Sequence, residues 1–192
     1  MKWLPREADN RVSTISQPGA AGELALPHLD AAYNLARWLL KSDQDAADAV
    51  HDAFLRAAGN MHTYRGDNGR SWWLAIVRNC CFAIMKARKR APQALDAVET
   101  GDDASLPHTE AAALEDNLHA AQCATRIAQH LERLPPEFRE VVVLREMEDC
   151  SYREIADILD VPIGTVMSRL ARARTLLKRA LADCFDRIDN GM

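Results

Sequence analysis

The chain has 192 residues, of which 48% are hydrophobic and 27% charged, and its formal net charge is −4. This mix is typical of a soluble globular protein with one ordinary domain or two small ones, and the net charge alone does not indicate a nucleic-acid partner. The five cysteines lack CxxC spacing and the six histidines lack metal-site spacing, so we expect reduced thiols, no metal and no cofactor.

The first half of the chain predicts a helical domain over residues 25–90. Residues 1–24 mix Pro, Gly, Ser and charges without a period, which predicts a flexible N-terminal arm. Apolar residues then recur at helical spacing over 29–40 and, after a Ser42 N-cap, over 42–59. A polar loop at 62–70 precedes a long helix that begins at Ser71, its expected N-cap, and ends in a basic cluster at 86–90.

The second half predicts another helical domain over residues 111–185. An acidic segment at 91–110 without an apolar period is expected to be a flexible linker. Helical periodicity resumes over 114–131, Pro135-Pro136 breaks it, and a short helix follows at 137–147. No convincing strand alternation occurs, so the predicted fold class is all-α, with two small helical domains joined by the linker.

The charges are unevenly distributed along the chain. Seven acids and no Lys or Arg lie between Ala91 and Thr125, whereas Ile163–Leu181 holds five basic residues and no acid. Together with the cluster at 86–90, this pattern favours two phosphate contacts separated by an acidic segment. A solvated helix face is an equally good interpretation of either basic patch alone.

Residues 151–177 predict a helix-turn-helix motif. Ser151 and Glu154 have capping-box spacing, and Ala156 is small, as needed where a second helix crosses closely. Asp160 tolerates the left-handed backbone of a turn, and Pro162 suits the start of the next helix.

One face of that second helix carries side chains suited to the major groove: Thr165, Ser168, Arg169 and Arg172. The alternative is an ordinary helical hairpin with an exposed basic side. The coincidence of capping box, small residue, turn and basic face favours DNA reading.

The segment LPPEFREVVVLREMEDCSYREIADILDVPIGTVMSRLARAR resembles the −35-reading domain of extracytoplasmic-function sigma factors. DAADAVHDAFLRA (45–57) resembles the polymerase-binding helix of that family, and TYRG…RSWWLAIVRNCC (63–81) resembles its −10-reading loop and helix. The resemblance implies a sigma factor that binds core RNA polymerase, directs it to promoter DNA, melts the promoter and catalyses no reaction. It also implies an anti-sigma protein as a partner.

The resemblance assigns three groups of site residues. The polymerase-binding residues would be Asp45, Asp48, Asp52, Phe54 and Arg56. The −10 DNA residues would be His62, Tyr64, Arg65, Arg70, Asn79, Lys86, Arg88, Lys89 and Arg90. The −35 DNA residues would be Arg145, Thr165, Met167, Ser168, Arg169 and Arg172. Phe54 also suits the core, and the three acids also suit a solvated face.

Three positions depart from the family pattern. Met167 stands where the family often has Arg or Lys, which replaces a polar contact to DNA with an apolar one. Gly69 stands where a bulky apolar residue is usual, and Trp73 where Leu is usual. We therefore expect the −10 loop to be anchored differently in this chain.

Three rival functions are less well supported by the sequence. A stand-alone DNA-binding regulator explains residues 131–181 but not the first domain. An enzyme lacks support, because no paired carboxylates, nucleophile motif or phosphate loop is present. A phage or plasmid anti-sigma protein is opposed by the promoter-reading motifs. Without an apolar run of about 18 residues or a signal core, the chain is expected to be cytoplasmic, with no membrane insertion.

Overall fold

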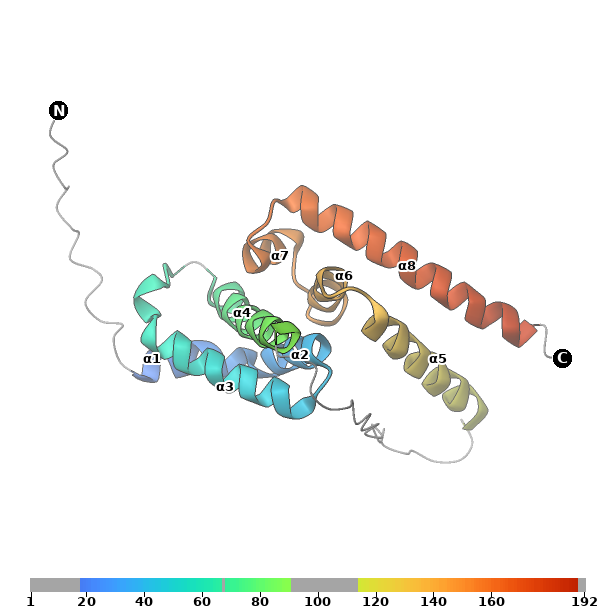
Figure 1. Ribbon diagram of the computed structural model, residues 1–192, viewed down its shortest axis with the longest axis horizontal. Coiled ribbons are helices and arrows are strands. Elements are labelled where there is room, and N and C mark those ends of the chain that lie inside the picture. Colours follow the sequence, from blue (N-terminus) through green and yellow to red (C-terminus); the bar gives the residue numbers. More distant parts are fainter. Residues whose placement is uncertain (1–17, 67, 91–113, 190–192) are drawn as a thin grey trace, which may run out of the picture.

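The computed structural model of the chain describes residues 18–66, 68–90 and 114–189, and throughout these residues the regular elements are helices. The N-terminal domain contains α1 (Pro18–Ala25), η1 (Leu26–His28), α2 (Leu29–Leu40), α3 (Asp43–Gly59), η2 (Met61–Thr63) and α4 (Gly69–Arg90). The C-terminal domain contains α5 (Leu114–Arg133), α6 (Pro136–Val142), the π-helical turn η3 (Val143–Met147), α7 (Tyr152–Leu159) and α8 (Ile163–Asp189). Figure 1 shows the two groups of helices side by side. The predicted linker at 91–110 lies outside the described residues.

The core of the N-terminal domain is built on alanine. Where α2, α3 and α4 meet, the buried side chains include Ala32, Ala36, Ala46, Ala49 and Ala53. Such small side chains let helix axes approach closely, and the larger Leu35, Trp73 and Leu74 fill the remaining space. Trp73, at a position where the family usually has Leu, is fully buried.

Helix α1 corrects the prediction of a flexible arm over the whole of residues 1–24. It packs against α3 and α4 through Ala21 and Ala25, which are 0% and 2% exposed. Leu24 of this helix also packs against the core, but the segment consists mostly of Gly and Ala and therefore gives almost no hydrophobic period. Tertiary packing therefore forms a helix that the pattern did not predict. Residues 1–17 lie outside the described part.

Two predicted helix starts have different outcomes. Ser42 caps α3 as expected, with its Oγ accepting from the Asp45 N–H at 3.3 Å. Ser71 does not cap α4: the Oδ1 of Asn68 accepts from the Ser71 N–H at 3.1 Å, and α4 begins at Gly69. The prediction of Ser71 was wrong because Asn, an equally good cap, precedes it by three residues.

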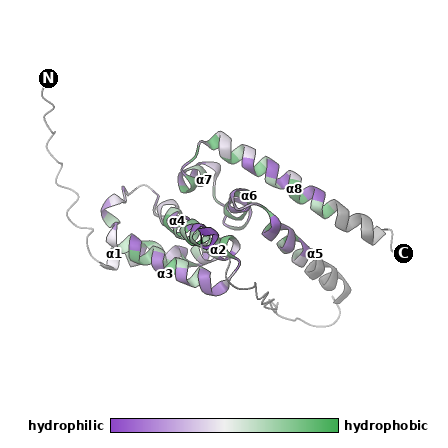
Figure 2. Ribbon diagram, in the orientation of Figure 1, coloured by the Kyte–Doolittle hydropathy of each residue, from purple (hydrophilic) through white to green (hydrophobic). Residues whose placement is uncertain are grey.

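The two domains pack on each other. Helix α4 lies against α7 and α2 lies against α6, and the buried residues of both domains form one continuous cluster. In the C-terminal domain α8 runs beside α5 and α6. Figure 2 shows hydrophilic and hydrophobic residues alternating along the coloured part of α8, as expected for a helix with one buried face. Among the described helices, none is long and apolar enough to cross a membrane.

Candidate DNA and polymerase interface

The predicted helix-turn-helix is formed by α7 and α8. The Ser151 Oγ accepts from the Glu154 N–H at 3.2 Å, and the Glu154 carboxylate accepts from the Ser151 N–H at 2.8 Å, which completes the capping box. These bonds hold the pKa of Glu154 below its usual value. Asp160 ends α7 in the left-handed conformation with a φ of 54°. The capping box and the turn thus form at the predicted residues.

One face of α8 is buried in the domain core, and the opposite side is exposed. Val166, Leu170 and Ala173 are at most 1% exposed and pack into the domain core. On the outer side, Met167 is 52% exposed and Ser168 and Arg172 are also exposed. Ser168 donates its hydroxyl to the Thr165 carbonyl at 2.9 Å, and Thr165 itself is half-buried. The outer side therefore presents a short hydroxyl, a thioether and a guanidinium to a partner.

Arg169 belongs to an ion-pair cluster inside the protein. Its Nη1 lies 3.2 Å from Oε1 of Glu140, and Arg78 of α4 binds the same carboxylate through Nε at 2.7 Å and Nη2 at 3.2 Å. Glu140 is 1% exposed. Burial raises the pKa of the Glu140 carboxyl, and the two guanidinium groups oppose that rise. Arg169 is thus engaged with α6 and, through Glu140, with the N-terminal domain.

Arg145 and Arg172, both predicted at the −35 element, also have protein contacts. Arg145 donates to the Cys150 carbonyl at 2.9 Å, and its guanidinium lies 5.3 Å from the Tyr152 ring centroid. Arg172 lies 5.8 Å from the Phe138 ring centroid and remains exposed. Arg145 braces the turn before α7, whereas Arg172 is held by a ring on one side only.

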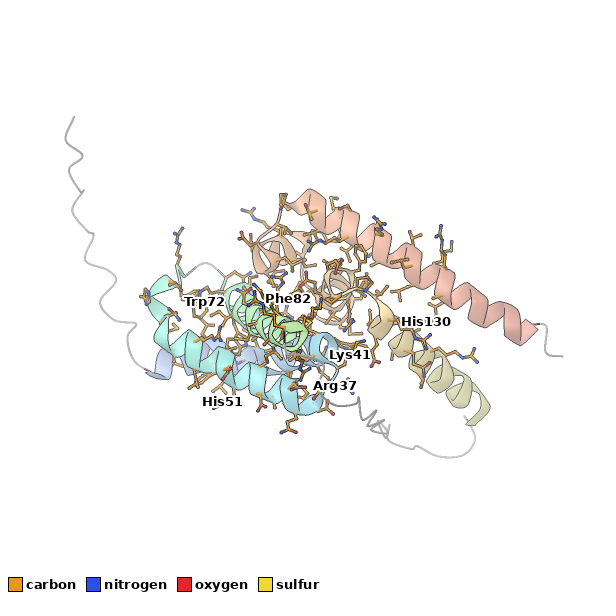
Figure 3. The ribbon with its side chains drawn as sticks, in the orientation of Figure 1. Arg37, Lys41, His51, Trp72, Phe82 and His130 are labelled. Atoms are coloured by element: carbon orange, nitrogen blue, oxygen red, sulfur yellow. The ribbon has the colours of Figure 1, made fainter. Side chains whose placement is uncertain are left out.

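The predicted −10 loop borders a cavity. The cavity has a volume of about 280 Å³ and is lined by Thr63, Tyr64, Arg65, Asn68, Ser71, Trp72, Ala75 and Asp157. Tyr64 and Trp72 have ring centroids 5.4 Å apart, and Figure 3 places Trp72 at the loop end of α4. Of the predicted residues, the exposed Arg65 lines the cavity, and His62 and Asn79 are exposed elsewhere on the loop and α4. Aromatic rings beside donors suit an unstacked base.

Gly69 has a steric role in anchoring this loop. A Cβ at this position would lie 3.1 Å from Leu24 Cγ and 3.3 Å from the Tyr64 hydroxyl. A side chain at this position would press on Leu24 and require it to shift, so the departure at Gly69 accompanies the close packing of α1 against α4.

The predicted polymerase and −10 groups meet at one ion pair. Arg88 Nη2 lies 2.5 Å from Asp45 Oδ2, and this contact lowers the pKa of Asp45. Asp48, Asp52 and Arg56 are exposed along α3. The other members of the basic cluster are exposed as well: Lys86, Lys89 and Arg90.

Phe54 lines an apolar groove rather than the centre of the core. The groove has a volume of about 520 Å³ and is lined by Ala25, Leu26, Leu29, Asp30, Tyr33, Ala47, Val50, His51, Phe54 and Trp73. Leu26 is 67% exposed at its edge. Exposed apolar side chains beside the acids of α3 are typical of a protein-binding surface.

Sequence reasoning missed the residues that join the domains. Arg139 is 3% exposed and donates to four carbonyl groups: Trp38 at 2.6 Å, Leu39 at 3.4 Å, Glu132 at 2.8 Å and Leu134 at 2.8 Å. Arg70, predicted to contact DNA, donates to the Glu148 carbonyl at 2.6 Å. The partners in the other domain lie 78 to 101 residues away along the chain, so no local spacing could have revealed these contacts.

The described thiols are buried and resist ionisation. Burial raises the pKa of Cys81 to about 12 and that of Cys150 to about 11, and it also raises the pKa of Cys80. Thiolate, the reactive form, is therefore scarce at neutral pH. Among the described side chains, no group of three or more His, Cys, Asp or Glu residues is arranged to hold a metal ion.

Comparisons with known proteins agree with this geometry. The model of sigma-70 region 2 matches residues 24–91, and that of sigma-70 region 4 matches residues 124–184. The ECF RNA polymerase sigma factor SigW of Bacillus subtilis is 31% identical over 160 residues, covering 80% of this chain and 84% of SigW. The chain belongs to the extracytoplasmic-function sigma factors.

Further similarities bear on length and fold. This sigma factor is 32% identical to the ECF RNA polymerase sigma factor SigE of Mycolicibacterium smegmatis over 165 residues, which cover 83% of this chain but only 61% of SigE. The sigma factor RpoE of Bartonella quintana, solved with the anti-sigma factor NepR, superposes with a TM-score of 0.64 at 23% identity. That match covers 84% of this chain and 96% of RpoE, and it confirms the all-helical fold. Sigma factors direct RNA polymerase to promoters at transcription initiation.

Proposed function

We propose that the two domains of this sigma factor divide promoter recognition between the residue groups predicted from the sequence. The main support for this proposal is that Met167, Ser168 and Arg172 are exposed on the outer side of α8, within a helix-turn-helix that has a capping box. This side would read the −35 element in the major groove. Thr165 lies at its margin. Arg145 and Arg169 would position the helix-turn-helix rather than contact DNA, because their guanidinium groups bind protein acceptors.

The N-terminal domain supplies the remaining parts of the proposal. The cavity beside Tyr64 and Trp72 would take a base flipped from the melted strand, and Lys86, Lys89 and Arg90 would hold nearby phosphates. Asp48 and Asp52, with the apolar groove at Phe54, would dock on core RNA polymerase. Arg88 and Asp45 would link these two surfaces.

Further parts of the proposal concern partners, chemistry and location. RpoE was solved with NepR, and CnrH, a further structural neighbour, was solved with the cytosolic domain of CnrY. An anti-sigma protein is accordingly proposed as a partner here. The chain is proposed to act in the cytoplasm and to catalyse no reaction itself. Its domains are proposed to be 25–90 and 111–185, joined by residues 91–110.

The test is run-off transcription with core polymerase across a promoter library. We expect transcripts only when core enzyme and this protein are combined, with sequence preferences at both elements. Footprinting by the protein alone, unchanged by core enzyme, would instead identify a stand-alone regulator. Transcription without preference at either element would contradict the proposed division of labour.

A further inference from the structure

The start of α8 carries a row of exposed apolar side chains beside the polar side chains proposed to read the −35 element. Ile163 and Met167 are 45% and 52% exposed, and Ala171, one turn further on, is exposed as well. These three residues are spaced by four, so they follow one ridge of the helix, and Ser168 and Arg172 follow the next ridge. An apolar row and a polar row therefore lie side by side at this end of α8.

The charges of α8 indicate what kind of partner covers the apolar row. Residues 163–181 include five basic residues and no acid, so this part of the helix attracts a polyanion. Exposed apolar side chains gain free energy only when apolar groups of a partner cover them. The partner is therefore negatively charged and also carries apolar groups. On the base edges in the major groove of DNA, the apolar group is the C5-methyl of thymine.

Gly164 leaves room for a close approach beside this row. A Cβ at position 164 would meet nothing within 4 Å, so no packing contact with another described element requires glycine there. Glycine nevertheless lowers the stability of a helix relative to alanine. Met167 and Ser168 lie one turn after it, on either side of the open space. The helix can therefore come close to base edges where the apolar and polar rows meet.

We propose that Ile163 and Met167, with Ala171 at the end of the row, recognise thymine methyl groups, so that this sigma factor selects A·T pairs at defined positions of the −35 element. This inference rests on the proposed −35 role of α8 and adds the chemistry that one half of its outer side reads. Successive members of the row lie about 6 Å apart along the helix, and base pairs stack about 3.4 Å apart. Ile163 and Met167 therefore reach different base pairs.

The test replaces thymine by deoxyuridine at one position of the −35 element at a time and measures run-off transcription with core polymerase and the full chain. Uracil differs from thymine only in lacking the methyl group, so the ratio of transcripts from the two promoters reports that methyl alone. At two positions we expect up to about fourfold fewer transcripts with uracil, which corresponds to about 0.8 kcal/mol for one buried methyl group.

Variants assign each methyl group to a side chain. Met167→Gln should abolish the difference between thymine and uracil at one position, because glutamine keeps the side-chain length but replaces its apolar end, and Met167→Leu should preserve the difference. Ile163→Ala should abolish the difference at another position. The matched control is Leu176→Gln, since Leu176 is 36% exposed on α8 outside the row, and it should leave every ratio unchanged. Circular dichroism checks that each variant folds.

Equal transcription from thymine and uracil promoters by the unmodified protein would overturn the proposal before any variant is made. A thymine preference that persists in both Met167→Gln and Ile163→Ala would also overturn it, since other side chains would then read the methyl groups. Singly mutated promoters separate this result from the proposed function. If no base of the −35 element affects transcription, the proposed function fails; if bases matter but thymine and uracil act alike, only the thymine inference fails.

Discussion

The two faces of this sigma factor that are proposed to read DNA differ in what the protein itself places on them. On α8, Met167, Ser168 and Arg172 are exposed beside a core that fixes the helix. On α4, Arg70 and Arg78 are bound to the C-terminal domain. A face that is already open needs only a partner, whereas an occupied face must first release its internal contacts, which lowers its apparent affinity. On the proposed roles of the two faces, the α8 face would be available to DNA before the α4 face.

Of the substitutions considered, Arg139→Met should reduce the free energy of unfolding most. Arg139 donates to the last carbonyls of α2, at Trp38 and Leu39, and to two carbonyls before α6, so it stabilises both domains at their contact. Leaving buried carbonyls without a cationic donor should reduce the free energy of unfolding by about 3–5 kcal/mol. Urea denaturation followed by circular dichroism measures the loss.

The matched control is Arg174→Met, which removes an exposed ion pair with Glu146. It should reduce the free energy of unfolding by less than about 1 kcal/mol. Equal small losses for both variants would mean that Arg139 does not hold the domains together.

Substitutions at Arg172 and Arg169 should distinguish a side chain of α8 that contacts DNA from one that stabilises the fold. Arg172→Ala should weaken −35-dependent transcription by about 1–3 kcal/mol and relax preference at one position, because its guanidinium is exposed on the outer side. Arg169→Ala should lower thermal stability and leave the preference profile unchanged, because its partner is the buried Glu140. Transcription from promoters mutated singly across the −35 element measures both. Full-rate transcription of every promoter by a folded Arg172→Ala variant would contradict the assignment.

Ser151→Ala should have a smaller effect than Arg139→Met, confined to the start of α7. Loss of the capping hydroxyl should cost about 0.5–2 kcal/mol of unfolding free energy at neutral pH. The partner Glu154 has a lowered pKa in the folded state, so its contribution is complete above its unfolded pKa, near 4.3, and is lost as pH falls through the lower folded value. Denaturation measured from pH 7 to pH 3 should therefore bring the variant and the unmodified protein closer together; a difference independent of pH would argue against coupling within the box.

Local patterns predicted those features whose partners lie within a few residues of each other. The Ser151–Glu154 box, the turn at Asp160 and the buried row of α8 follow from spacing, because a helix repeats its contacts every three or four residues. Helix α1 was not predicted in the same way, since Gly and Ala make up most of its sequence and give little contrast in hydropathy. The spacing of Arg169 placed it with Ser168 and Arg172, but it could not distinguish the middle of the exposed face from its edge.

By itself, then, the sequence determined the helical class, the helix-turn-helix and the family, all of which depend on neighbours along the chain. Only the tertiary structure decided which polar side chains are bound to other groups of the protein. Arg78 and Glu140 are 62 residues apart, and Asn34 and Glu148, whose side chains meet at 2.6 Å, are 114 apart. A guanidinium on a helix has the same spacing whether it faces water, DNA or a carboxylate. The folding of α4 onto α7 brings the carboxylate to Arg78, and no periodicity within either helix records that contact.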